Sequence, residues 1–221
     1  MDETQIRGSR LPFNQFNADQ ARHSDQGSSA CARICASLAK LFIEGELDID
    51  RDLSDCDKMR HFYTDAVRAV DAARANGGHS VEDACREAGI RHLKQKQAVE
   101  PGDLASELSV SSPCALCVTA FKLNGDNNRS LRSSPTGGTS VIFVSSRVLV
   151  FHDPHCGDTI QLEGLGIRTA DAFESAVFAH MKRRGCETNL LEIIRCMADD
   201  MAPEERDRLT NVADYPNAGD R

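Results

Sequence analysis

Long hydrophobic runs and a hydrophobic leader are both missing from this sequence. No stretch reaches the roughly 18 consecutive apolar residues that a membrane-spanning helix needs, so we expect no transmembrane segment and no membrane partner. Residues 1–10 are polar and contain no apolar signal-peptide core, so we also expect no export signal.

The sequence also lacks an excess of positive charge. It has 26 Lys and Arg against 34 Asp and Glu, a formal net charge of −8. Phosphate binding requires a basic face, so this balance argues against nucleic acid as a partner. An acidic protein can instead accept a basic protein segment as its substrate.

Size and composition predict one globular domain. The chain has 221 residues, of which 40% are hydrophobic, although tryptophan is absent. We expect the domain to span residues 1–202 and to be a monomer. Residues 203–221 are rich in charge, and we expect a flexible tail there.

Cysteine is abundant, with nine residues. Because the number is odd and no secretion signal is visible, we expect reduced thiols and a location in the cytoplasm or nucleus. Most of them are expected to be small buried hydrophobic residues.

The order of predicted elements indicates an α+β fold, with helices first, then an antiparallel sheet, then helices again. Residues 1–25 look extended or irregular, and residues 94–97 look like a polar linker. Strands are expected at 114–123, 140–144, 147–151 and 159–162, the middle two forming a hairpin. Helices are expected from Ser28 or Ser29 to Ile43, at 56–75, from Ser80, and at 101–108, 169–184 and 189–201.

Cys31 is the candidate nucleophile because it lies at the predicted start of an apolar helix. The helix dipole and the unpaired amides of the first turn favour a thiolate there. The backbone N–H of Cys31 could also face a developing oxyanion. A packing role, like that expected for Cys35 one turn later, is the alternative.

Asp153 and His155 follow a predicted strand with one residue between them. Alternate residues of a strand share a face, so the carboxylate could orient the imidazole and stabilise the imidazolium. His152 competes with His155 for the same role, but it would face the other side of the strand. An ordinary Asp-Pro turn is the alternative reading.

An oxyanion also needs a donor, and a side-chain amide before the cysteine can supply one. Asn17, Gln20 and Gln26 are the three candidates, and at least two of them must be ordinary loop residues.

Metal binding is a competing interpretation. A zinc site built from Cys31, Cys35, His155 and Cys156 would make the chain a zinc-stabilised interaction domain, although these residues lack two pairs at finger spacing. Cys114 and Cys117 have the spacing of a redox or zinc pair, but a strand would direct them to opposite faces. We expect no cofactor and no metal.

Two segments resemble the deubiquitinase domain of herpesvirus large tegument proteins. They are residues 147–156, Arg-Val-Leu-Val-Phe-His-Asp-Pro-His-Cys, and residues 21–31, which lead into Cys31. The resemblance implies a papain-like cysteine peptidase with Cys31 as nucleophile, His155 as general base and acid, and Asp153 as its orienter. That family carries a Gln more than ten residues before the nucleophile, where this chain has Asn17 or Ala18, with Gln20 slightly later.

The resemblance further implies cleavage after the C-terminal Gly of ubiquitin, with ubiquitin and polyubiquitin chains as partners. The protein would act in a host cell if it is viral or a microbial effector. Acidic residues should meet the Arg side chain of the ubiquitin tail, and Glu107 and Asp65 are two candidates. A catalytically silent ubiquitin-binding module on the same fold is the alternative, motivated by the extra His152 and by the position of the family's Gln. Spacing between Gln26 and Cys31 also resembles Josephin-type deubiquitinases.

Overall fold

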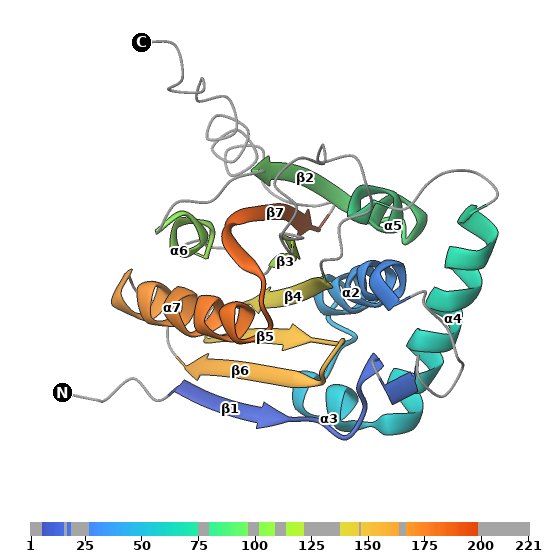
Figure 1. Cartoon of the computed structure of the whole chain (residues 1–221), viewed down its shortest axis with the longest axis horizontal. Coiled ribbons are helices and arrows are strands. Elements are labelled where there is room, and N and C mark those ends of the chain that lie inside the picture. Colours follow the sequence, from blue (N-terminus) through green and yellow to red (C-terminus); the bar gives the residue numbers. More distant parts are fainter. Residues whose placement is uncertain are drawn as a thin grey trace, which may run out of the picture.

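The computed structural model of the chain describes residues 6–15, 17–18, 27–74, 80–96, 102–108, 114–121, 138–145, 147–163 and 167–198 (Figure 1). The expected tail at 203–221 lies outside the described residues. No helix in the described ranges is both long enough and apolar enough to cross a membrane.

A seven-stranded sheet forms the centre of the molecule, in the order β1-β6-β5-β4-β3-β7-β2. Every neighbouring pair in it is antiparallel. The strands in chain order are β1 (Ile6–Arg10), β2 (Arg91–Lys96), β3 (Cys114–Phe121), β4 (Gly138–Val144), β5 (Val148–Asp153), β6 (Asp158–Glu163) and β7 (Glu187–Met197).

Helices cover both faces of this sheet, as Figure 1 shows. One face carries four helices: α2 (Gly27–Ile43), α3 (Ile49–Ser54), α4 (Cys56–Arg74) and α5 (Val81–Glu87). The other carries two: α6 (Asp103–Glu107) and α7 (Ile167–Arg183).

The side chains of the sheet divide between two hydrophobic cores, one on each face. Val141, Phe143 and Val150 pack with α2 and α4, whereas Ile142 and Phe151 pack with α7. The alternation follows from the two-residue period of a strand. It also determines which face of the sheet each β5 side chain occupies. Residues 148, 150 and 152 face α2, and residues 149, 151 and 153 face α7.

Most of the predicted elements are confirmed. The hairpin is β4 and β5, and α2 and α4 end within a residue of their expected limits. Ser80 caps α5 in a reciprocal capping box, because its hydroxyl accepts from the Asp83 N–H and the Asp83 carboxylate accepts from the Ser80 N–H. The expected α+β class is the observed one.

Two expectations about secondary structure are wrong. Residues 189–201 were expected to be helical, but Glu187–Met197 form β7, which pairs with β3 on one side and β2 on the other. The expected linker at 94–97 overlaps the end of β2. Residues 1–25 were expected to be extended or irregular, and within them Ile6–Arg10 form an edge strand whose five residues are all exposed.

Candidate active site

The segment after β1 is fixed to the turn between β5 and β6. The Leu11 N–H donates to the Gly157 carbonyl at 2.7 Å, and the Gln15 N–H donates to the Pro154 carbonyl at 2.9 Å. Within the turn, the Gly157 N–H donates to the Asp153 carbonyl at 2.8 Å. Residues 11–15 therefore run directly along the Asp-Pro-His turn that the sequence singled out.

Gly157 allows this close approach. It has a φ of +74°, and a Cβ at its position would lie 2.5 Å from the Phe13 carbonyl oxygen and 3.1 Å from the Leu11 carbonyl oxygen. Phe13 is itself buried, and its ring centroid lies 6.1 Å from that of Tyr63 on α4. The segment is thus held between the turn and a helix.

Cys31 lies in the second turn of α2, because the helix begins at Gly27 rather than at Ser28 or Ser29. An N–H in the second turn has an intrahelical acceptor, so the expected use of the Cys31 amide as an oxyanion donor is not supported. The side chain is fully buried. The structure therefore shows the site closed to solvent.

Gln15 connects the two halves of the site. The Cys31 thiol donates to Gln15 Oε1 at 2.7 Å, and the backbone of Gln15 is bonded to Pro154, the residue before His155. Gln15 is fully buried. Residues 15, 31 and 153–155, which are far apart in sequence, are brought together by these contacts.

Gln15 was not among the three amide side chains expected from the sequence. Of those three, Asn17 is exposed, and Gln20 and Gln26 lie outside the described residues. Gln15 precedes Cys31 by 16 residues. A Gln more than ten residues before the cysteine was expected from the resemblance, but no local feature distinguishes Gln15 from Asn17 or Gln20.

Asp153 ends β5, and residues 154–157 form the turn. The strand-alternation argument that put the Asp153 and His155 side chains on one face therefore does not apply. Instead, Asp153 Oδ1 accepts the backbone N–H of His155 at 3.0 Å. The carboxylate thus fixes the backbone of the residue expected to act as base.

The other carboxylate oxygen of Asp153 faces α7. Oδ2 lies 3.0 Å from His180 Nε2 and is also paired with Arg184 Nη1. Burial opposes ionisation of this carboxyl, but His180 and Arg184 outweigh that effect and lower its pKa to about 2. His180 is therefore a buried partner of Asp153, and the sequence gives no indication of this pairing.

The two neighbouring histidines have different surroundings. His155 is partly buried in the turn, whereas His152 is almost completely buried in the sheet, and neither of its ring nitrogens has a hydrogen-bond partner within the described part of the chain. Burial lowers the pKa of His152 to about 4. His152 is thus neutral near pH 7 and suits an imidazolium poorly.

The zinc set expected as an alternative is not assembled. Cys35 Sγ donates to the Thr139 carbonyl at 3.4 Å, and burial raises the pKa of its thiol well above the usual value. Among the described residues, metal-ligating side chains gather in two groups of three, Cys85 with Cys117 and Cys196, and separately Asp153 with Cys156 and His180. Cys114 and Cys117 face opposite cores, as predicted.

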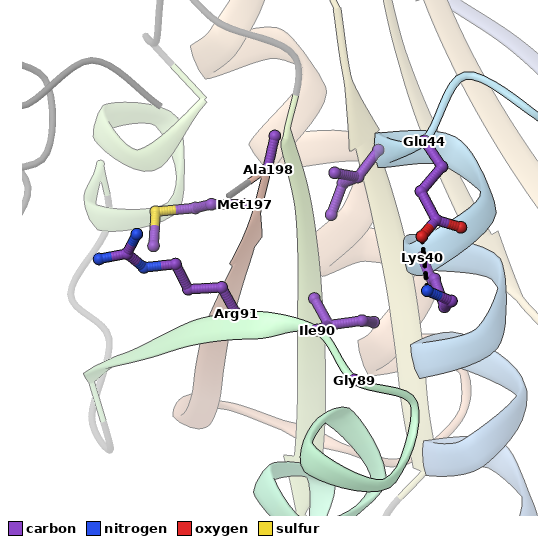
Figure 2. Close-up of a pocket in the computed structure, with 8 residues that line it drawn as sticks. Lys40, Glu44, Gly89, Ile90, Arg91, Met197 and Ala198 are labelled. Atoms are coloured by element: carbon purple, nitrogen blue, oxygen red, sulfur yellow. Dashed lines mark hydrogen bonds and ion pairs between the residues drawn. The ribbon is translucent and has the colours of Figure 1, made fainter. Parts of the chain in front are cut away.

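Two further features lie apart from Cys31. A pocket of about 310 Å³ is bounded by Lys40 and Glu44 at the C-terminal end of α2 and by the chain around Arg91 and Met197 (Figure 2). Cys31 lies near the opposite end of that helix.

Glu107, which was expected to meet the Arg side chain of the ubiquitin tail, is buried and bonded to Arg195 at 2.7 Å, which corrects that expectation.

Comparisons with known proteins identify the fold. No protein-family model and no curated protein matches the chain. Among solved structures, the chain is similar to the Pseudomonas avirulence protein AvrPphB, with a TM-score of 0.52 and 12% identity, over 76% of this chain and 92% of that one. It is also similar to PatoxP, a cysteine protease-like domain of the Photorhabdus asymbiotica toxin PaTox, with a TM-score of 0.48 and 12% identity, over 94% of this chain and 60% of that one. The fold is α+β and papain-like, as expected.

Proposed function

We propose that this chain is a cysteine peptidase that removes ubiquitin from conjugates by cleaving after its C-terminal Gly. One observation carries the proposal: the Cys31 thiol is bonded to Gln15, whose backbone is bonded to the turn that presents His155. A thiol and a side-chain amide are thus in contact beside the turn that carries His155, on a papain-like fold.

The reaction is an acyl transfer through a thioester. Cys31 gives its proton to His155, and its sulfur attacks the carbonyl carbon of the terminal Gly. The C–N bond breaks as His155 returns the proton to the leaving lysine amine. His155 then takes a proton from water, and the resulting hydroxide displaces the Cys31 sulfur, which leaves a free carboxylate and regenerates the thiol.

Gln15 supplies the oxyanion donor in this scheme. Its amide carries Nε2–H₂ next to the Oε1 that faces Cys31, and a half-turn of the amide brings Nε2 toward the attacked carbonyl. Asp153 is a positioning residue, since its carboxylate holds the His155 N–H. Because Cys31 and Gln15 are buried, the substrate tail must open the site on binding.

Ubiquitin is proposed as substrate because residues 147–156 and 21–31 resemble the tegument deubiquitinase motifs. The net charge of −8 supports it, because the ubiquitin tail carries an Arg next to its terminal glycines.

The test is incubation with ubiquitin that carries a C-terminal electrophile, followed by intact-mass measurement. We expect one ubiquitin per chain, and the adduct should disappear in Cys31→Ala. Cys56→Ala is the matched control, since Cys56 is a half-buried thiol on α4. An adduct that persists in Cys31→Ala refutes the nucleophile. Binding of ubiquitin by the folded chain without any adduct identifies the silent module instead.

A further inference from the structure

Three cysteines meet in the core between α5 and the far half of the sheet. Cys85 comes from α5, Cys117 from β3 and Cys196 from β7, and all three are fully buried. Their sulfur atoms lie within 4.8 Å of one another, and those of Cys85 and Cys196 are 3.7 Å apart. The peptidase mechanism uses none of them.

The sheet register explains how they converge. Cys196 lies opposite Ala115 on β3, and Cys117 follows two residues later on the same face of the sheet. Both belong to the core that contains α5, where Cys85 lies above them. The cluster is therefore built from three different elements and is not an accident of local sequence.

We propose that Cys85, Cys117 and Cys196 bind a zinc ion, with His92 as its fourth ligand. Tetrahedral zinc holds thiolate sulfur atoms at about 2.3 Å, which places them roughly 3.8 Å apart. The separation of 3.7 Å between Cys85 and Cys196 matches that edge of a tetrahedron. Three cysteines and one histidine are a common set of ligands for structural zinc.

His92 is the candidate for the fourth position, and its ring must turn toward the cluster on metal binding, because its nitrogens do not lie within 4.8 Å of all three sulfur atoms. It lies directly opposite Cys196 in the pairing of β2 with β7, so the two side chains share a face of the sheet. Its Nδ1 is 3.0 Å from the Ile90 carbonyl oxygen. A backbone carbonyl in that position fixes the tautomer and leaves Nε2 available to a metal.

The second cluster of metal-ligating side chains, Asp153, Cys156 and His180, is a poorer candidate for a metal. The Arg184 guanidinium is already paired with the Asp153 carboxylate there, so a further cation beside Asp153 is disfavoured.

The pocket at the end of α2 borders the same part of the chain. It is lined by Arg91 and Met197, which are the chain neighbours of His92 and Cys196 (Figure 2). A bound ion would join α5 to the sheet and hold β2, which is the edge strand there. Its role would be structural.

The test uses the full chain, freed of metal by a chelator and kept under a thiol-free reductant. Co²⁺ is the probe, because its thiolate charge-transfer and tetrahedral ligand-field bands report the ligand set. We expect one Co²⁺ per chain, displaced by Zn²⁺, and a rise in Tm with Zn²⁺. If the wild-type chain shows tetrahedral bands together with charge transfer from three thiolates, this spectrum alone supports the site, even before any variant is made.

Substitutions then assign the ligands. Cys85→Ser, Cys117→Ser and Cys196→Ser should each weaken Co²⁺ binding at least a hundredfold, and His92→Ala at least tenfold. Cys56→Ser, which removes a thiol from α4, should change nothing. Absence of Co²⁺ bands in folded wild-type protein, or an equal loss in Cys56→Ser, would overturn the proposal. Because Cys31→Ala leaves the metal site intact, failure of the peptidase proposal would not affect this result.

Discussion

At the scale of single residues, Gln15 has the largest consequence for the site. It has no local sequence feature that distinguishes it from Asn17 or Gln20, and it reaches Cys31 only because residues 11–15 dock on the turn after β5. Cys31, Asp153 and His155 could be selected from sequence, because each belongs to a recognisable segment. The amide could not, since its selection depends on a contact between segments distant in the chain.

Gln15→Ala should lower kcat on a fluorogenic ubiquitin substrate by roughly 10²–10³, because the oxyanion loses its side-chain donor. Asn17→Ala is the matched control and should have little effect, since Asn17 is exposed. Steady-state kinetics of both variants, with Tm as a check on folding, decide the point. Equal activity in the two variants would remove Gln15 from the mechanism.

His155→Ala should abolish turnover, because the thiol and the leaving amine lose their proton carrier. His152→Leu should retain most of the activity, since both nitrogens of the buried ring are unpartnered and its pKa of about 4 keeps it neutral. Cleavage of a fluorogenic substrate measures both. Full activity in His155→Ala with loss in His152→Leu would exchange their roles.

His152 should also make the protein less stable in acid. An unfolded histidine binds a proton with a pKa near 6.5, whereas folded His152 does so only with a pKa of about 4. The unfolded state therefore gains protons first, and the free energy of unfolding falls by about 3 kcal/mol in total as the pH drops from 6.5 to below 4. Urea unfolding at several pH values measures the change.

The comparison variant for that experiment is His152→Leu, which should flatten the pH dependence between 6.5 and 4. It should also be the more stable protein at pH 7, since an apolar side chain replaces two unsatisfied nitrogens. An unchanged slope would assign the acid sensitivity to another group. Asp153 contributes to acid sensitivity only at lower pH. Its carboxyl binds a proton with a pKa near 4 in the unfolded chain and about 2 in the folded chain, so its effect on stability falls between those two values.

At the scale of elements, length decided which buried strands could be recognised. β4 and β5 are buried on both faces, yet each is a short β-rich run, and the two were found as a hairpin. β7 is also buried on both faces, with Leu191 and Ile193 in one core and Ile194 and Cys196 in the other. It has 11 residues and no alternation to detect, so it was mistaken for a helix.

β1 was missed for the opposite reason. All five of its residues are exposed, so no hydrophobic pattern marks it. Its pairing with β6 nevertheless sets the path of residues 11–15 and hence the position of Gln15.

Gly157→Ala tests the docking of that segment. The added Cβ would collide with the Phe13 carbonyl, and the φ of +74° adds strain. Gly185→Ala is the matched control, because Gly185 has a φ of +72° and nothing within 4 Å. We expect Gly185→Ala to cost about 1 kcal/mol of unfolding free energy, and Gly157→Ala about 1–3 kcal/mol more.

Activity separates the two glycine variants further. Gly157→Ala should lose most of its turnover, since Gln15 and the turn before His155 move apart, whereas Gly185→Ala should keep it. Chemical denaturation and kinetics on both proteins provide the measurements. Equal losses in the two variants would show that backbone strain alone matters.

At the scale of the whole molecule, one sheet supports two cores. Cys31 and Gln15 lie on the α2 side, whereas the Asp153 carboxylate faces His180 and Arg184 on the α7 side. The site therefore depends on packing at both faces. Two-sided packing of this kind favours a single cooperative unfolding transition.

Phe173→Ala tests that cooperativity from the side remote from Cys31. Phe173 is a fully buried α7 residue, and its truncation should lower the free energy of unfolding by about 3–5 kcal/mol. Unfolding followed by far-UV circular dichroism and by alkylation of Cys31 should shift together to lower denaturant. Alkylation that keeps its wild-type midpoint would show that the two cores unfold separately.

The pairing of β1 with β6 also has a consequence for synthesis of the chain. Ile6 pairs with Leu162, and Leu11 with Gly157, so Gln15 cannot be positioned until residue 163 has left the ribosome. Cys31 and Gln15 are synthesised early, but their contact depends on a strand that is synthesised late. Under the proposed mechanism, the nascent chain would therefore lack peptidase activity until β6 has formed.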